Sequence, residues 1–200
     1  MIKKVINFTA KVILVSSILI SLLFFFCGYK YVEYHLKKSL STPLHHIESD
    51  IHKTKPLPDN ILDTFNEMYK TKHVISYINE SLFENRSGKY MSEETSQLII
   101  VHYSSGQNRY GFPKLVLAHQ LEQQFSDDQL LVFYASNFDF LNNNTGFYSA
   151  SLHYFDKKLE DLNKREAATL ILMLDNPRMY HPHRASALER LNQRLELLGY

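Results

Sequence analysis

The sequence predicts a mainly α-helical protein with a single membrane-spanning helix near its N-terminus. Three observations support this prediction: an unbroken apolar run early in the chain, a second run that is apolar on all sides, and several amphipathic segments with short connections. No alternating strand pattern of useful length competes with these segments. Two hundred residues suffice for one domain of ordinary size with its own core.

The first apolar run extends from Val12 to Tyr29. At about 1.5 Å per residue, it is just long enough to cross a hydrocarbon core of about 30 Å. Lys11 and Lys30 bracket the run, and their long side chains can reach the two interfaces. A cleaved signal peptide is the alternative, because basic residues precede the run. No small-x-small cleavage site closes it, so we interpret it as an uncleaved signal anchor.

After the anchor, the chain is expected to continue as a helix to about Ser41. Residues 43–60 contain three prolines and predict a juxtamembrane linker rather than a second domain. Amphipathic or capped helices are then expected in four places. Their marker residues are Leu62, Phe65 and Met68; Pro113 with Leu115, Ala118, Leu121 and Phe125; Ser126 and Gln129 as caps for Leu130, Leu131 and Tyr134; and Leu188, Leu191, Leu195 and Leu198.

A capping box marks the start of the most apolar helix. Asn163 and Glu166 have the spacing at which an N-cap side chain and a carboxylate satisfy each other's backbone amides. The run AATLILML that follows, residues 167–174, is apolar all round. Its helix is therefore expected to be buried on every side by other helices. Pro177, which has no amide donor, is expected to end it.

The residues around this helix form a longer pattern: G-x-x-x-A-x-x-x-Y-F-x-K, then L-x-x-x-E-A-A-x-L, then P-x-x-Y-x-P. In this pattern the chain resembles the second half of the peptidoglycan glycosyltransferase domain, the transglycosylase module of penicillin-binding proteins. Many positions match in fixed register, but such a match is one of scaffold and does not carry chemistry. The matching residues are Gly146, Ala150, Tyr154, Phe155, Lys157, Leu162, Glu166, Ala167, Ala168, Leu170, Pro177, Tyr180 and Pro182.

The resemblance implies a compact, lysozyme-like helical domain over residues 58–200. It would be preceded by a cytoplasmic tail (1–11), the transmembrane anchor (12–29) and a juxtamembrane helix and linker (30–57). Lysines on both sides of the span leave its orientation a near tie by charge. The resemblance resolves the tie and implies a bacterial cytoplasmic membrane, with the domain on its outer face.

The family joins lipid-linked disaccharides: a carboxylate deprotonates the acceptor hydroxyl, which attacks the donor's anomeric carbon and expels a lipid pyrophosphate. Its signature E-D-x-x-F-x-x-H-x-G aligns with residues 79–88. The position of the base is occupied by Asn79, and an amide cannot take a proton at neutral pH. Arg86 stands in place of the histidine. Glu80 remains the fallback base, with Glu84 and Glu122 as further carboxylates.

The family's second carboxylate, in R-K-x-x-E, corresponds to Lys114. The S-T-I-T-Q-Q-x-x-K signature is equally altered, since Ser96 to Ser104 reads SQLIIVHYS. Only the eight residues 89–96 run from Gly88 to the start of the second signature. The segment that closes over the donor in the family therefore looks deleted. The C-terminal half thus keeps the family's pattern, while the N-terminal half loses its reactive groups.

We therefore predict a monofunctional-type, non-catalytic member that binds lipid-linked disaccharide diphosphate or a partner cell-wall polymerase at the membrane. An active enzyme with a relocated base and a purely structural scaffold are the alternatives. Arg86, Arg109 and Lys114 are the candidate ligands for a diphosphate. The net charge of +1 gives no strong field towards nucleic acid. No cofactor or metal is expected, because the exposed loop pairs His45–His46 and His181–His183 lack further ligands.

Overall fold

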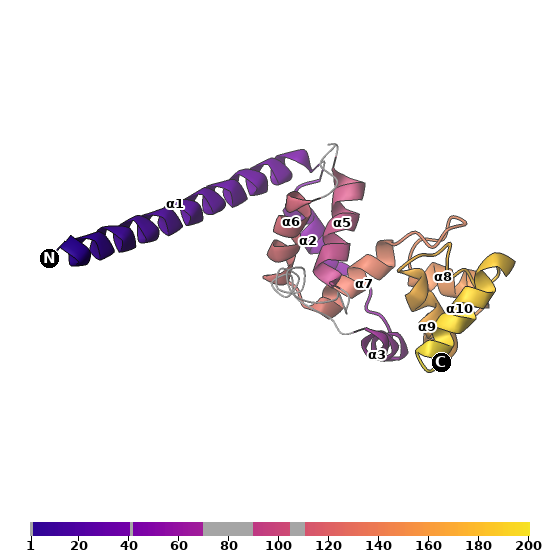
Figure 1. Cartoon of the computed structure of the whole chain (residues 1–200). Helices are drawn as coiled ribbons and strands as arrows, with labels where there is room; N and C mark the ends of the chain where they lie inside the picture. The colour runs from indigo at the N-terminus through magenta and orange to yellow at the C-terminus, as the bar shows by residue number, and fades with distance from the viewer. Residues whose placement is uncertain (1, 41, 70–89, 105–110) are drawn as a thin grey trace.

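The computed structural model of the chain describes residues 2–40, 42–69, 90–104 and 111–200. Within these ranges the regular elements are helices, accompanied by two isolated β-bridges, Leu40–Ser104 and Asp139–Thr145. Figure 1 shows one long N-terminal helix and a cluster of shorter ones. The prediction of a mainly α-helical chain is confirmed.

The long helix α1 (Ile2–Ser39) contains the apolar segment and reaches the hydrophobic core of the helical cluster at its C-terminal end. By length and composition, its Lys11–Ser39 portion could cross a membrane. Its N-terminal part extends away from the other helices (Figure 1). At the other end of the helix, Leu36 and the following Leu40 are buried in the main hydrophobic core. The apolar segment and the domain core are thus connected without a break in the helix.

Where the sequence predicted a linker, residues 44–53 form the helix α2 (Leu44–Lys53). Ile47 and Ile51, which are one turn apart, are buried in the main core, and α2 contacts α7 (Asp127–Asn137). The linker prediction was wrong here because the prolines that motivated it lie outside the helix. Two isoleucines at i and i+4 are enough to bury one face of a short helix that is otherwise polar.

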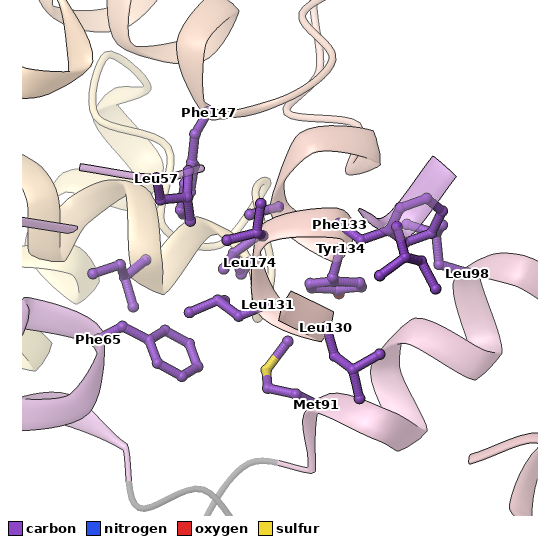
Figure 2. Packing of buried hydrophobic residues seen from close by; sticks show 14 of the residues in the cluster. Leu57, Phe65, Met91, Leu98, Leu130, Leu131, Phe133, Tyr134, Phe147 and Leu174 are labelled. Carbon is purple, nitrogen blue, oxygen red and sulfur yellow. The ribbon is translucent and has the colours of Figure 1, made fainter. Parts of the chain in front are cut away.

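The N-terminal part of the cluster is built from α5 (Met91–Tyr103), α6 (Phe112–Glu122) and α7. Helix α5 packs against both others, and Figure 2 shows side chains from α5 and α7 meeting in the core. Pro113 lies in the first turn of α6, and Ser126 and Gln129 form a capping box on α7, both as predicted. The buried face of α6 differs from the expected one, because Val116 and Leu117 are buried whereas Leu115 is only partly buried.

The C-terminal part surrounds α9 (Lys164–Met173), with α3 (Asp59–Met68), α8 (Phe147–Phe155) and α10 (Ala185–Leu197) in contact with it. A 3₁₀ turn at Leu159–Asp161 packs on α3 and α8. The predicted capping box is present: the Glu166 amide donates to Asn163 Oδ1 at 2.9 Å, and the Asn163 amide donates to Glu166 Oε2 at 3.0 Å. Every residue from Ala167 to Met173 is buried, which confirms a helix buried on all sides.

Two details of this part differ from the prediction. Helix α9 ends at Met173, before Pro177, because Asn176 Oδ1 accepts hydrogen bonds from the Arg178 and Met179 amides and starts a turn. On α10, Leu188 is exposed, whereas Leu191 and Leu195 are buried as expected. The shorter side chain of Ala187 takes the inward position instead.

Gly146 precedes α8 in a backbone conformation, φ 81° and ψ 156°, that is nearly exclusive to glycine. A Cβ atom there would lie 2.6 Å from the Ser136 carbonyl oxygen. Gly146→Ala is therefore expected to cost more than the roughly 1–3 kcal/mol of backbone strain alone. Gly111→Ala is the matched control, because Gly111 has φ 90° but its Cβ would meet no described atom within 4 Å. Chemical denaturation of both variants measures the difference, and equal losses would contradict the close approach.

Candidate functional site

Most residues of the predicted site lie outside the part of the chain that the structure describes. Lys114 is described, and so is Glu122, one of the remaining carboxylates. The stretch that contains the aligned base position lies between Tyr69, which follows α3, and Tyr90, which precedes α5. The predicted residues outside the described ranges are Asn79, Glu80, Glu84, Arg86 and Arg109.

Lys114, in the first turn of α6, forms an ion pair with Glu93 in the first turn of α5. The two side chains are only 20% and 18% exposed, so water screens the pair weakly. The first turn of α6 thus carries a cation that a carboxylate from the neighbouring helix neutralises. A phosphate group could bind Lys114 only by competing with Glu93.

Glu122, at the end of α6, also has a partner on α5. The Ser92 hydroxyl donates a hydrogen bond of 2.6 Å to Glu122 Oε1, and the Ser92 side chain is fully buried. This bond ties the end of α6 to the beginning of α5. Glu122 therefore has a structural contact at the interface between the two helices.

Glu94 contacts α7, on another side of the first turn of α5. Its Oε2 accepts a hydrogen bond of 3.4 Å from the Tyr134 hydroxyl. Burial, followed by the negative charges of Glu94 and Asp175, raises the pKa of the Tyr134 phenol. The phenol consequently stays protonated and remains a donor at neutral pH. Glu93 and Glu94 did not emerge from the sequence, because their partners lie on other helices and no local spacing connects them.

Next to Glu94, a hollow of about 230 Å³ lies between α5 and α7. Its surface is chiefly apolar, because the polar side chains around it bond to nearby atoms. His102 Nδ1 lies 3.0 Å from the Leu98 carbonyl, and Asn137 Nδ2 donates to the Phe133 carbonyl at 2.8 Å. The ring centroids of Tyr134 and Phe138 are 5.4 Å apart. The remaining lining residues are Gln97, Val101 and Asp139.

A second tyrosine–carboxylate pair joins α3 to the end of α9. The Tyr69 hydroxyl donates a hydrogen bond to Asp175 Oδ2. Burial and the neighbouring Asp175 charge raise the pKa of Tyr69. Because Asp175 also contributes to the raised pKa of Tyr134, the two pairs lie close enough to interact electrostatically. Tyrosine–carboxylate contacts thus join α5 to α7, and the end of α3 to the end of α9.

His181, in the P-x-x-Y-x-P turn, is 91% buried rather than exposed as predicted. The His183 amide donates to His181 Nδ1 at 3.1 Å, which requires that nitrogen to be unprotonated. The His181 ring packs edge-on against Tyr154, with their centroids 5.2 Å apart. Burial, and then the charges of Arg184, His183 and His153, lower the pKa of His181. The described residues include no group of three or more histidine, cysteine or acidic side chains placed to hold a metal ion.

The lowered pKa of His181 predicts that the folded protein loses stability in acid. A histidine with a lowered pKa in the folded state stabilises the fold fully above its unfolded pKa of about 6.5. That stability is lost as the pH falls from there through the folded pKa, because the unfolded chain binds the proton more tightly. We expect His181→Gln to flatten the dependence of the melting temperature on pH between 7.5 and 5. His46→Gln, at an exposed position on α2, is the control and should retain the wild-type slope.

The residues that carried the resemblance form the scaffold around α9. Ala150, Ala167 and Ala168 are buried, and the Lys157 ammonium bonds both Glu166 oxygens, at 2.7 and 2.9 Å. Because Glu166 also closes the capping box, one side chain connects the start of α9 to the segment after α8. These residues of the sequence pattern thus hold the helices of the domain together through burial and hydrogen bonds.

The comparison with protein families identifies this domain. Residues 93–198 match the transglycosylase family model, and the chain belongs to that family. The chain is 30% identical over 122 residues to the biosynthetic peptidoglycan transglycosylase of Mannheimia succiniciproducens, covering 61% of this chain and 49% of that protein. For the protein of the same name from Haemophilus influenzae strain PittEE, the identity is 28% over 127 residues, covering 62% and 52%.

A longer relative matches over a shorter region. Penicillin-binding protein 1A of Streptococcus oralis is 36% identical over 78 residues, which cover 38% of this chain and 12% of that protein. The chain spans about half the length of the biosynthetic peptidoglycan transglycosylases that it matches. The resemblance found from the sequence pattern is confirmed at the level of the family.

Proposed function

We propose that this chain is a membrane-anchored member of the transglycosylase family that binds lipid-linked disaccharide diphosphate without polymerising it. The observation that carries the loss of polymerisation is the Lys114–Glu93 ion pair, at the position that the resemblance assigns to a family carboxylate. The names of the relatives, biosynthetic peptidoglycan transglycosylases, support the substrate class. The proposal includes cell-wall assembly on the outer face of a bacterial cytoplasmic membrane, the location that the family resemblance implies.

The absence of turnover is argued from the chemistry that a general base requires. Such a base typically raises the reaction rate about 10²–10⁴-fold, and in this family it is a carboxylate within reach of the acceptor hydroxyl. Asn79 and Lys114 cannot accept that proton at neutral pH. The carboxylates at the start of α5 have structural partners: Glu93 pairs with Lys114, and Glu94 accepts from Tyr134. An active enzyme with Glu80 as a relocated base is the competing proposal.

Anchoring is supported by the continuous helix α1. Its apolar portion is long enough to span a bilayer, and its end is buried in the domain core. We assign residues 1–11 to a cytoplasmic tail, 12–29 to the anchor, 30–57 to a juxtamembrane region that includes α2, and 58–200 to the domain. Confinement to the membrane raises the effective concentration of lipid-linked ligands and of partner polymerases, so that weak contacts can suffice.

The ligand proposal is tested by titrating the purified full chain in nanodiscs with a labelled lipid-linked disaccharide diphosphate at two salt concentrations. We expect saturable binding that weakens as salt rises, because Arg86, Arg109 and Lys114 are the proposed phosphate ligands. The Arg86→Ala, Lys114→Ala double variant should bind more weakly, whereas the exposed-site variant Lys164→Ala should bind like the wild type. Equal binding by all proteins would contradict the proposed phosphate ligands, and no binding by any would leave only a scaffold role.

A further inference from the structure

We propose that a polar hollow between α1, α2 and α6 binds the headgroup of an ethanolamine phospholipid through its primary ammonium and phosphate groups. The hollow has a volume of about 300 Å³ and shares no lining residue with the hollow between α5 and α7. The inference rests on the proposed anchor for the source of the ligand, and it does not depend on the proposed sugar ligand.

The position of the hollow along α1 matches the headgroup layer of a membrane. Tyr29, Glu33 and Lys37 line it from α1, and their spacing of four residues places them on one face of that helix. Tyr29 is the last residue of the apolar run, so the hollow begins where that run ends and extends about 12 Å farther along the helix axis. If α1 crosses a bilayer, the beginning of the hollow is therefore at the level of the headgroups, which lie directly outside the hydrocarbon core.

Contacts between the three helices hold the walls of the hollow in place. Helix α6 packs against α1, and the rings of His119 and Tyr29 meet edge to face with their centroids 6.4 Å apart. On the α2 side, Glu48 Oε1 accepts a hydrogen bond of 3.2 Å from Gln124 Nε2, just after the end of α6. The polar groups are thus positioned before a ligand binds, which lowers the entropic cost of binding.

The charges of the hollow favour a ligand that carries an ammonium group. Glu33 is neutralised by Lys30 and Lys37, with N–O distances of 2.8 and 2.9 Å. In the described part of the chain, by contrast, no basic side chain forms an ion pair with the partly buried Glu48. A primary ammonium group has three N–H donors and no acceptor, so it can bond this carboxylate and the carbonyl oxygens of the neighbouring glutamines together.

The same hollow offers donors for a phosphate. The Lys37 ammonium donates one hydrogen bond to Glu33 and has two further N–H groups. Gln120 and Gln123 also line the hollow, and their side-chain amides carry N–H donors. An ethanolamine headgroup joins a primary ammonium to a phosphodiester through two carbons, so both ends can be bound in one hollow of this volume. A metal ion suits the hollow less, because the described residues include no group of three histidine, cysteine or acidic side chains placed to hold one.

Two lipids that differ only in the ammonium group test the proposal on the unmodified protein. The full chain in dodecyl maltoside micelles would be titrated with dioctanoyl phosphatidylethanolamine, and bound lipid would be measured by native mass spectrometry. Dioctanoyl phosphatidylcholine is the matched ligand, because it has the same phosphate and acyl chains but a quaternary ammonium without N–H donors. We expect the ethanolamine lipid to bind about tenfold more tightly or more, since only it can donate hydrogen bonds to Glu48. Equal affinities would overturn the inference.

Two variants of α2 locate the site. Glu48→Gln should lower the affinity for the ethanolamine lipid to about that for the choline lipid, whereas Asp50→Asn, at an exposed position of the same helix, should bind like the wild type. An equal loss in both variants, or no loss in Glu48→Gln, would contradict the site.

Soluble O-phosphoethanolamine distinguishes a membrane lipid from a free metabolite as the source of the ligand. It should displace the ethanolamine lipid only at much higher concentration, because it lacks the glycerol and acyl groups that lie beside α1. Displacement at equal concentration would contradict a lipid as the ligand. These titrations use neither a bilayer nor the lipid-linked sugar, so their outcome is independent of the anchor and of the proposed sugar ligand.

Discussion

Replacing Leu170 with alanine is expected to lower the free energy of unfolding by about 2–5 kcal/mol. Leu170 lies in the middle of α9, and its side chain is fully buried in the main core. Helices α3, α8 and α10 all contact α9, so their backbones cannot easily close the cavity that truncation leaves. Urea denaturation followed by circular dichroism measures the change.

Leu197→Ala is the control for this substitution. The same atoms are removed, but Leu197 is 80% exposed at the end of α10, so we expect a change within about 0.5 kcal/mol. Similar losses for both variants would contradict a domain organised around a fully buried α9.

Breaking the Lys114–Glu93 pair is the second change for which we expect a large effect. Lys114→Met keeps the length of the side chain but leaves Glu93 as an unpaired carboxylate that is only 18% exposed. We expect a loss of about 1–3 kcal/mol, the cost of leaving a largely buried acceptor without its partner. The exchange Glu93→Lys, Lys114→Glu should recover most of this loss, because it restores an ion pair between the same two helices.

A double-mutant cycle of Lys114→Met, Glu93→Gln and the variant that combines the two gives the coupling free energy of the pair. Lys164 and Glu67 provide the comparison: their side chains are 73% and 51% exposed, and their N–O distance is 3.2 Å. An exposed pair of this kind is expected to couple by about 0–1 kcal/mol. If the Lys114–Glu93 coupling is no larger, the pair is effectively solvated and contributes little to the stability of the domain.

The parts of the fold that the sequence predicted are those governed by local rules. The capping boxes at Ser126 and Asn163 depend on side chains three residues apart, and both are present. The apolar run of α9 identified it as a buried helix without knowledge of its neighbours. The length of the apolar run in α1 likewise identified a possible membrane span. Pro113 marked the start of α6 because its ring fits only the first turn of a helix.

The features that the sequence missed depend on contacts between distant segments. Glu93 and Lys114 are on different helices, so no helical spacing relates them. His181 is buried because α8 presents Tyr154 to it, which the polar composition of its turn concealed. Helix α2 was hidden by the surrounding prolines, although two isoleucines were enough to anchor it. The candidate site is the least predictable part, because tertiary pairing decides which charges remain available.

The central claim is that the chain binds the family's substrate without turning it over. The most direct measurement is polymerisation by the full chain in nanodiscs, with a labelled lipid-linked disaccharide diphosphate as the substrate and gel separation of the products. We predict no glycan polymer from the wild type or from Asn79→Glu, since the proposed counterpart of the family's second carboxylate is Lys114 in both proteins. Polymer made by the wild type, and abolished by Glu80→Gln, would contradict the account and identify Glu80 as a relocated base.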